Sequence, residues 1–187
     1  EFNEEMIQQA IRRELARGGQ VFFLHDRVRS INTMARLVEK LVPEARVGLV
    51  HGQMKGAEIE RAMVAFVRKD FDVLVCTTII GAGLDIPTAN TIIVNRADRF
   101  GLAQLYQIRG RVGRARDEAY ACLFVPKGAL LSPEARRRLE VILEFTEPGS
   151  GFRIAAGDLD IRGAGNLLGL SQSGHISAVG YELYTEL

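Results

Sequence analysis

The sequence is poor in several residue types that would mark particular classes of protein. It has two cysteines, three histidines and no tryptophan in 187 residues. Cys76 and Cys122 lie inside apolar runs, so small core residues explain them better than a disulfide or a reactive thiol. No Cys/His spacing fits a zinc site, and no apolar run approaches the roughly 18 residues of a membrane span. Glu1–Glu5 is acidic and polar, unlike a secretory signal. These absences are consistent with a soluble, cytoplasmic globular protein.

Lysine is also scarce. Only four of the 24 basic residues are lysine, and the other 20 are arginine. Arginine is always charged and binds phosphate or carboxylate through two parallel contacts. Because a GC-rich or heat-adapted genome explains most of this excess, only arginines in a specific context indicate a function. The net charge of +1 indicates no partner.

Short apolar runs alternate with segments of helical periodicity. The runs are continuous, which is typical of parallel strands covered on both faces. They occupy 21–24, 47–50, 73–76, 91–94 and 121–125. The helical segments between them, 31–41, 59–67 and 102–108, are long enough for the crossovers that parallel strands need. We therefore expect an α/β fold, a parallel sheet with helices on both faces.

Polar residues follow four of the runs. They are His25–Arg27, His51–Gln53, Thr77–Thr78 and Asn95–Asp98. A single polar loop has little meaning, but ligands of open α/β sheets bind beyond the carboxyl ends of the strands. Four such exits in succession predict one functional edge.

The C-terminal third begins with a further helix. Ser132, Pro133 and Glu134 form a start signal for a helix over about 132–145. We expect Leu139, Ile142 and Leu143 on one face of it. The breaker sequence TEPGSG follows, and it leads to a glycine-rich tail. We therefore divide the chain into a domain over 1–148 and a second unit over 149–187.

The strongest motif is Q-x-x-G-R-x-x-R, from Gln107 to Arg114. On a helix, Arg111 and Arg114 project from one face. Two adjacent guanidinium groups favour an anion between them, and a γ-phosphate held by arginine fingers is such an anion. A solvated basic helix face, or one that contacts DNA phosphates, is the alternative. The glutamine and the glycines in register favour the nucleotide.

A second motif runs from Cys76 to Pro87, where a strand ends in two threonines before a loop with glycines and one acid. Hydroxyls and free backbone N–H groups suit a phosphate. G-x-G alone is a weak signal, and it gains weight here by lying between two predicted strands.

Together these segments resemble a known family. Val21–Val125 is similar to the C-terminal RecA-like lobe of superfamily 2 helicases, with FFLHDR, VLVCTTIIGAGLDIP and QLYQIRGRVGR as motifs IV, V and VI. The resemblance implies that catalytic side chains face ATP: Gln107, Arg111 and Arg114. It puts Gly83 and Asp85 at the edge of the ATP site. It also implies that Thr77, His51 and Gly52 contact DNA phosphates, and it supports Arg27 as a DNA contact less strongly.

The tail, GFRIAAGDLDIRGAGNLLGLSQSG, resembles the translocation motif shared by RecG and the transcription-repair coupling factors. The resemblance implies a helical hairpin and hook that links closure of the ATP site to movement along duplex DNA, with Arg162 and Gln172 as coupling residues. RecG has R-G-P-G-E where Arg162–Asn166 stands here, so the tail is more similar to the coupling factors.

That family implies further partners and an activity. They are double-stranded DNA, a first RecA-like lobe, and RNA polymerase and a UvrA-type repair protein through other domains. The expected activity is ATP-driven translocation that displaces stalled RNA polymerase for excision repair. A RecG-like lobe acting on branched DNA is the alternative.

Half of the nucleotide site is absent from the sequence. No G-x-x-x-x-G-K-[ST] loop occurs. Asp117–Tyr120 mimics a DEAx box but precedes a predicted strand instead of following one. We therefore expect ATP and Mg²⁺ to be held mainly by another lobe, and the chain to be inactive alone. Two other functions fit the sequence less well. A passive nucleic-acid or protein-binding module has no need of the paired arginine fingers Arg111 and Arg114. A small nucleotide-cofactor enzyme needs G-x-G-x-x-G where His25–Arg29 stands.

Overall fold

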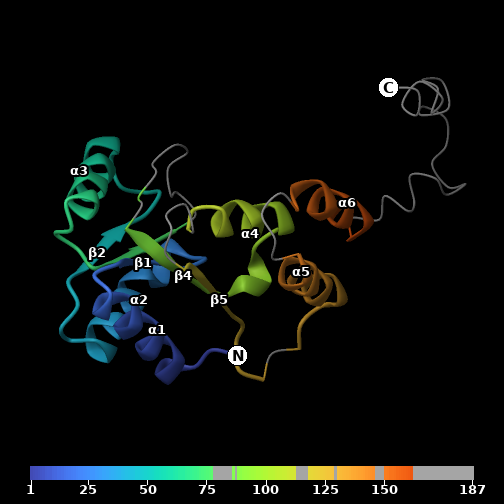
Figure 1. Ribbon diagram of the computed structural model, residues 1–187, viewed down its shortest axis with the longest axis horizontal. Helices are drawn as coiled ribbons and strands as arrows, with labels where there is room; N and C mark the ends of the chain where they lie inside the picture. Colours follow the sequence, from blue (N-terminus) through green and yellow to red (C-terminus); the bar gives the residue numbers. More distant parts are fainter. Residues whose placement is uncertain (78–85, 87, 113–117, 129, 146–149, 162–187) are drawn as a thin grey trace, which may run out of the picture.

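A computed structural model describes residues 1–77, 86, 88–112, 118–128, 130–145 and 150–161. Five strands form one parallel sheet in the order β2-β3-β1-β4-β5 (Figure 1). They are β1 (Gln20–Leu24), β2 (Val47–Val50), β3 (Val73–Cys76), β4 (Ala89–Asn95) and β5 (Tyr120–Phe124). The five apolar runs are therefore the five strands, and the predicted α/β fold is confirmed.

Helices cover both faces of the sheet. They are α1 (Glu4–Ala16), α2 (Val28–Leu41), α3 (Gly56–Val67), α4 (Leu102–Arg109), α5 (Pro133–Glu144) and α6 (Gly151–Ile161), with a 3₁₀ turn, η1 (Ala97–Arg99), before α4. Side chains of β1 alternate between two cores. Val21 and Phe23 pack with α1 and α2, whereas Phe22 and Leu24 pack with the core that α3, α4, α5 and α6 share.

Helix α1 was not among the predicted elements. Its Asn3 cap accepts hydrogen bonds from the N–H groups of Glu5 and Met6 at 2.9 and 3.2 Å. Ile7 and Ile11, one turn apart, are completely buried. The cap, the acids in the first turn and the four-residue step were present in the sequence as a helix signal.

The amino ends of the strands are closed by buried polar contacts. The Gln20 side-chain amide donates to the carbonyls of Phe66 and Phe71, both at 2.7 Å, and its oxygen accepts from the Thr88 hydroxyl. Glu14, fully buried on α1, accepts from Arg17 and from the Thr91 hydroxyl. Most of these polar groups are paired inside the domain, and Glu14 Oε1 is the exception among the described side chains. This pairing holds α1, β1 and β4 together at the amino edge.

The two cysteines lie where the apolar runs put them. Cys76 is buried, and Cys122 is partly buried against the core under α1 and α2. Burial raises the pKa of both thiols. Both are therefore less reactive than an exposed cysteine.

Helix α5 begins as predicted, with the Ser132 hydroxyl accepting from the N–H of Ala135 at 3.2 Å. Of the three residues predicted on one face of α5, Ile142 is buried and Leu139 packs partly against the core, whereas Leu143, contrary to the prediction, is 65% exposed. Val141 also faces the core, and Leu143 lies one residue, about 100° of helix rotation, beyond Ile142. Helix α6 packs against α4 and α5 through the buried Ile154 (Figure 1). The division at 148/149 stays a prediction.

Candidate functional site at the carboxyl edge of the sheet

The strand exits meet at one edge. The N–H of His25 donates to the carbonyl of Cys76 at 2.9 Å, and the N–H of Thr77 donates to that of Val50 at 3.2 Å. The side chains of His25 and Asn95, which follow and end their strands, are 3.2 Å apart. The exits of β1, β2, β3 and β4 therefore form a continuous surface, as the sequence predicts.

His25 is a buried link within this edge. Its ring is in hydrogen-bond contact with Ser30 Oγ through Nε2 at 2.7 Å and with the Asn95 amide through Nδ1 at 3.2 Å. Because the Asn95 amide nitrogen is a donor, Nδ1 accepts and Nε2–H donates to Ser30. Burial lowers the pKa of His25, although the nearby Asp26 raises it in part. The neutral His25 ring, with both nitrogens in hydrogen bonds, links β1 to α2 and β4 and is not directed at a phosphate.

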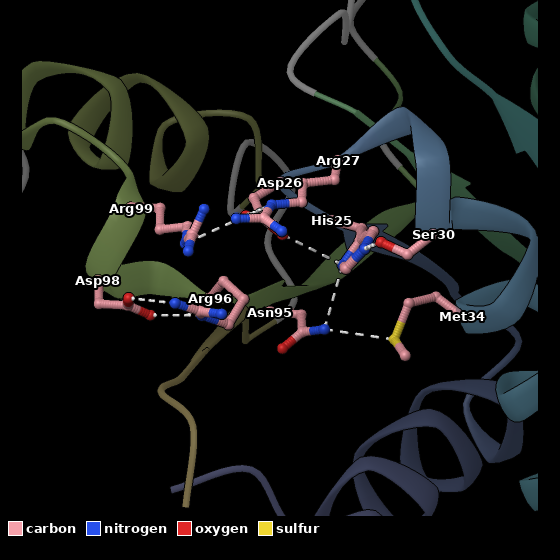
Figure 2. A network of polar contacts seen from close by, with 9 residues as sticks. All are labelled: His25, Asp26, Arg27, Ser30, Met34, Asn95, Arg96, Asp98 and Arg99. Carbon is pink, nitrogen blue, oxygen red and sulfur yellow. Dashed lines mark hydrogen bonds and ion pairs between the residues drawn. The ribbon is translucent and has the colours of Figure 1, made fainter. Parts of the chain in front are cut away.

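Asp26 lies at the centre of a charged group, which Figure 2 shows in close view. Its carboxylate is 3.4 Å from Nε of Arg27 and 3.4 Å from Nε of Arg99. The Asp26 side chain is 8% exposed, whereas those of Arg27 and Arg99 are 56% and 40% exposed. Arg99, from η1, was not among the sequence candidates. The only local signal for Arg99 in the sequence is the mixture of basic and acidic residues in R-A-D-R, directly after β4.

The exit of β4 has a constrained backbone. Arg96 has φ 61° and ψ 45°, in the left-handed region, which costs a residue other than glycine about 1–2 kcal/mol. Two hydrogen bonds to Asp98, at 3.1 and 3.0 Å, hold its guanidinium and raise the pKa of Arg96. Arg138 of α5 donates to the Asp98 carbonyl at 3.0 Å. The edge is therefore tied to the C-terminal helices.

Thr77, His51 and Gly52 lie at this edge as predicted. Thr77 is 6% exposed, and its hydroxyl has no hydrogen-bond partner within the described part of the chain. The N–H of Gln53 donates to Nδ1 of His51 at 3.3 Å. A neutral His51 therefore carries its proton on Nε2, the nitrogen free of that contact. Gly52 is exposed.

Arg111 does not lie on a helix, so that part of the prediction is wrong. Helix α4 ends at Arg109, and Gly110 is its C-cap. The N–H of Arg111 then bonds the carbonyl of Ile108 at 3.0 Å, a three-residue step that tightens the chain into a turn. Glycine disfavours helix by about 1 kcal/mol, which explains the ending here.

The side chains on and after α4 divide into two kinds. Arg109 donates to the carbonyls of Ile142 and Phe145 and so fastens α4 to α5. Gln107 is exposed and Arg111 is partly exposed. Among the residues that the structure describes, neither side chain has a hydrogen bond or ion pair, and no acid neutralises the Arg111 guanidinium. These two groups are available to a ligand, whereas Arg109 is structural.

Five predicted site residues lie outside the described residues: Gly83, Asp85, Arg114, Arg162 and Gln172. Glu118, of the DEAx-like sequence, precedes β5 as expected and accepts from the Tyr120 hydroxyl. Within the described ranges, no three His, Cys, Asp or Glu side chains are grouped so as to hold a metal ion. Nor does any helix in those ranges have the length and apolar character to cross a membrane.

Comparison with known proteins gives consistent matches. The model of the helicase conserved C-terminal domain matches residues 3–116. Transcription-repair-coupling factors from Myxococcus xanthus and Escherichia coli K12 are 53% and 51% identical over 186 and 187 residues, all of this chain. The chain spans only 16% of the length of each of these relatives.

Among solved structures, RecG bound to a three-way DNA junction is 39% identical, with a TM-score of 0.73 over 87% of this chain and 21% of that one. Domain 2 of the DEAD-box helicase Mss116p, bound to an RNA duplex, is 17% identical with a TM-score of 0.60, over 84% of this chain and 62% of that one. The second likeness concerns the fold alone.

Proposed function

The chain belongs to the family of helicase conserved C-terminal domains, and from that premise we propose that it is the second motor lobe of an ATP-driven translocase of double-stranded DNA. The observation that carries the proposal is the pair Gln107 and Arg111. Both lie at the end of α4 with no partner among the described side chains.

The nucleotide lies between two lobes in this proposal. Arg111, with Arg114, reaches toward the γ-phosphate and stabilises the charge that develops during transfer. Gln107, Gly83 and Asp85 complete this side of the site. Asp26 and Asp98 are each paired with arginine, so they offer Mg²⁺ no free carboxylates. Because the sequence has no G-x-x-x-x-G-K-[ST] loop, the ion and the phosphate cradle belong mainly to the other lobe in this proposal.

The DNA backbone lies along the strand exits. The Thr77 hydroxyl is buried and unsatisfied within the described residues, which costs about 1–3 kcal/mol unless a ligand oxygen completes it. His51 offers an Nε2 donor, Gly52 an exposed backbone, and Arg27 a charge that is 56% exposed. All four suit phosphate oxygens and carry no base recognition.

The second unit, 149–187, couples the two sites. Its first helix, α6, packs on α4, which carries Gln107. A shift of α4 on closure of the ATP site is therefore transmitted to α6, and through Arg162 and Gln172 to the DNA.

For the whole protein we propose the activity named by its relatives, transcription-repair coupling. The stalled polymerase and the UvrA-type repair protein are engaged by other domains, in the cytoplasm. Identity of 53% to a coupling factor against 39% to RecG supports this reading. A RecG-like role on branched DNA is the second candidate.

The test is ATP hydrolysis by the full-length protein. Arg111→Ala is expected to reduce turnover by about 10³–10⁵-fold, while nucleotide binding remains measurable. Arg137→Ala is the control, because the Arg137 side chain is 60% exposed on α5 and, among the described residues, pairs with Glu140 alone. The 187-residue chain alone should show no turnover. Wild-type turnover in Arg111→Ala, or hydrolysis by the chain alone, contradicts the proposal.

A further inference from the structure

Two arginines from different elements share one buried acid at the carboxyl edge. Arg27 caps α2 and Arg99 ends η1, and Asp26 lies between them at 3.4 Å from each (Figure 2). One carboxylate balances only one of the two positive charges. The neighbouring Arg96 and Asp98 cancel each other. The group therefore retains one net positive charge at the surface.

The orientation of the guanidinium groups adds to this excess charge. Asp26 is closest to the Nε atom of each arginine. The described residues provide no hydrogen bond to the terminal Nη atoms of either side chain. The four Nη atoms of the two side chains are thus available to an external anion. A tetrahedral phosphate accepts hydrogen bonds from two guanidinium groups at once.

We propose that Arg27 and Arg99 jointly bind one phosphate of the DNA backbone, with Asp26 setting the position of both side chains. The inference rests on the proposed function and adds Arg99 as a DNA-binding residue and Asp26 as a positioning residue. Because η1 leads directly into α4, this contact also fastens the DNA to the element that carries Gln107.

The first experiment measures binding of full-length protein to duplex DNA, with a non-hydrolysable ATP analogue, over a series of salt concentrations. Each phosphate neutralised contributes about 0.9 to the slope of log K against log[salt]. Arg99→Gln is expected to lower the slope by about 0.9 and to weaken binding equally for unrelated sequences. Arg99→Lys, which keeps the charge, should retain most of the slope.

The matched control is Arg12→Gln. Arg12 is 50% exposed and pairs through Nε with Glu44, which precedes β2 at the opposite edge of the sheet. Arg12→Gln removes one positive charge from an arginine–carboxylate pair, as Arg99→Gln does. Equal slopes for Arg99→Gln and Arg12→Gln would overturn the inference. Failure of the wild-type protein to bind DNA would instead overturn the proposed function, so the two failures are distinguishable.

The second experiment asks whether removing the Asp26 carboxylate strengthens or weakens DNA binding. Removing an acid beside a DNA phosphate ordinarily strengthens binding, since like charges repel. If Asp26 positions the two arginines, Asp26→Asn weakens binding in spite of the lost negative charge, and Arg99→Gln then has little further effect in that background. Thermal unfolding of each variant shows whether the fold is kept. Tighter binding by a folded Asp26→Asn protein would remove Asp26 from the positioning role.

Discussion

At the scale of single residues, the carboxyl edge depends on polar groups that are satisfied inside the domain and others that are not. His25 and Asn95 complete each other's hydrogen bonds, whereas the Thr77 hydroxyl has no described partner. The first kind fixes the positions of the strand exits. The unsatisfied groups can bind a ligand. Leaving a buried polar group without a hydrogen bond costs more free energy than a formed hydrogen bond contributes.

His25 gives this edge a pH dependence of known sign. Burial lowers its pKa from the ordinary value of 6.5, so the unfolded chain binds the proton more readily than the folded one. Stability is therefore complete above about pH 6.5 and falls as the pH drops from there toward the folded pKa. We expect the urea midpoint of the wild-type chain to decrease over this window, and that of His25→Gln to change less.

The carboxylates do not obscure this effect. Asp72 and Glu44 are held by Arg46 and Arg12, which lowers their pKa from 3.8 and 4.5. Their contributions are lost only at lower pH, outside the histidine window. Identical pH dependence in wild-type and His25→Gln proteins between pH 7 and 5 would show that His25 does not titrate on unfolding.

At the scale of elements, two glycines differ in the space that surrounds them. A Cβ at Gly48, in β2, would lie 2.5 Å from Cδ2 of the Phe71 ring, whereas one at Gly56, the first residue of α3, meets nothing within 4 Å. We expect Gly48→Ala to destabilise the fold by about 1–3 kcal/mol through overpacking. Gly56→Ala should be neutral or stabilising by up to about 1 kcal/mol. Chemical denaturation measures both, and equal midpoints would contradict the packing argument.

Elements were predictable from the sequence where one physical signal dominated. The inner strands β1, β3 and β4 are buried along their whole length and require continuous apolar runs. The edge strands β2 and β5 are only partly buried, but their apolar runs were found as well. Arg111 was assigned to a helix because spacing alone does not reveal where a helix stops, and Gly110 ends it. Arg99 was missed because its role depends on Asp26, 73 positions earlier in the chain, and no local pattern reports such a contact.

At the scale of the whole molecule, the polar groups at the two edges of the sheet are arranged differently. Gln20 and one carboxylate oxygen of Glu14 accept or donate internally at the amino ends of the strands. Arg27 and Arg99 remain exposed in part at the carboxyl ends, and Arg111 is partly exposed just beyond α4. An excess of cations over acids at this edge favours an anionic ligand. The sequence predicted this edge from its strand exits, but the charge balance depended on contacts between elements.

If α6 couples the two sites as proposed, coupling depends on how closely α6 approaches α4 and α5. A Cβ at Gly157 of α6 would lie 3.2 Å from Cγ1 of Val141 and 3.8 Å from Cδ2 of Leu102. The branched side chain of Gly157→Val therefore forces α6 away from both helices. In the full-length protein we expect ATP hydrolysis to persist, because Arg111 is not on α6, while translocation along duplex DNA falls severely.

Ala155→Val is the control, since Ala155 is exposed on the same helix and the substitution places the same β-branched side chain in α6. Ala155→Val lowers helix propensity and Gly157→Val does not, so a larger effect of Gly157→Val reports the packing of α6. Displacement of a third DNA strand reports translocation, and phosphate release reports hydrolysis, in the same sample. If hydrolysis and translocation fall together in Gly157→Val, α6 supports the geometry of the ATP site itself. If Gly157→Val matches Ala155→Val in both assays, the close packing of α6 has no part in coupling.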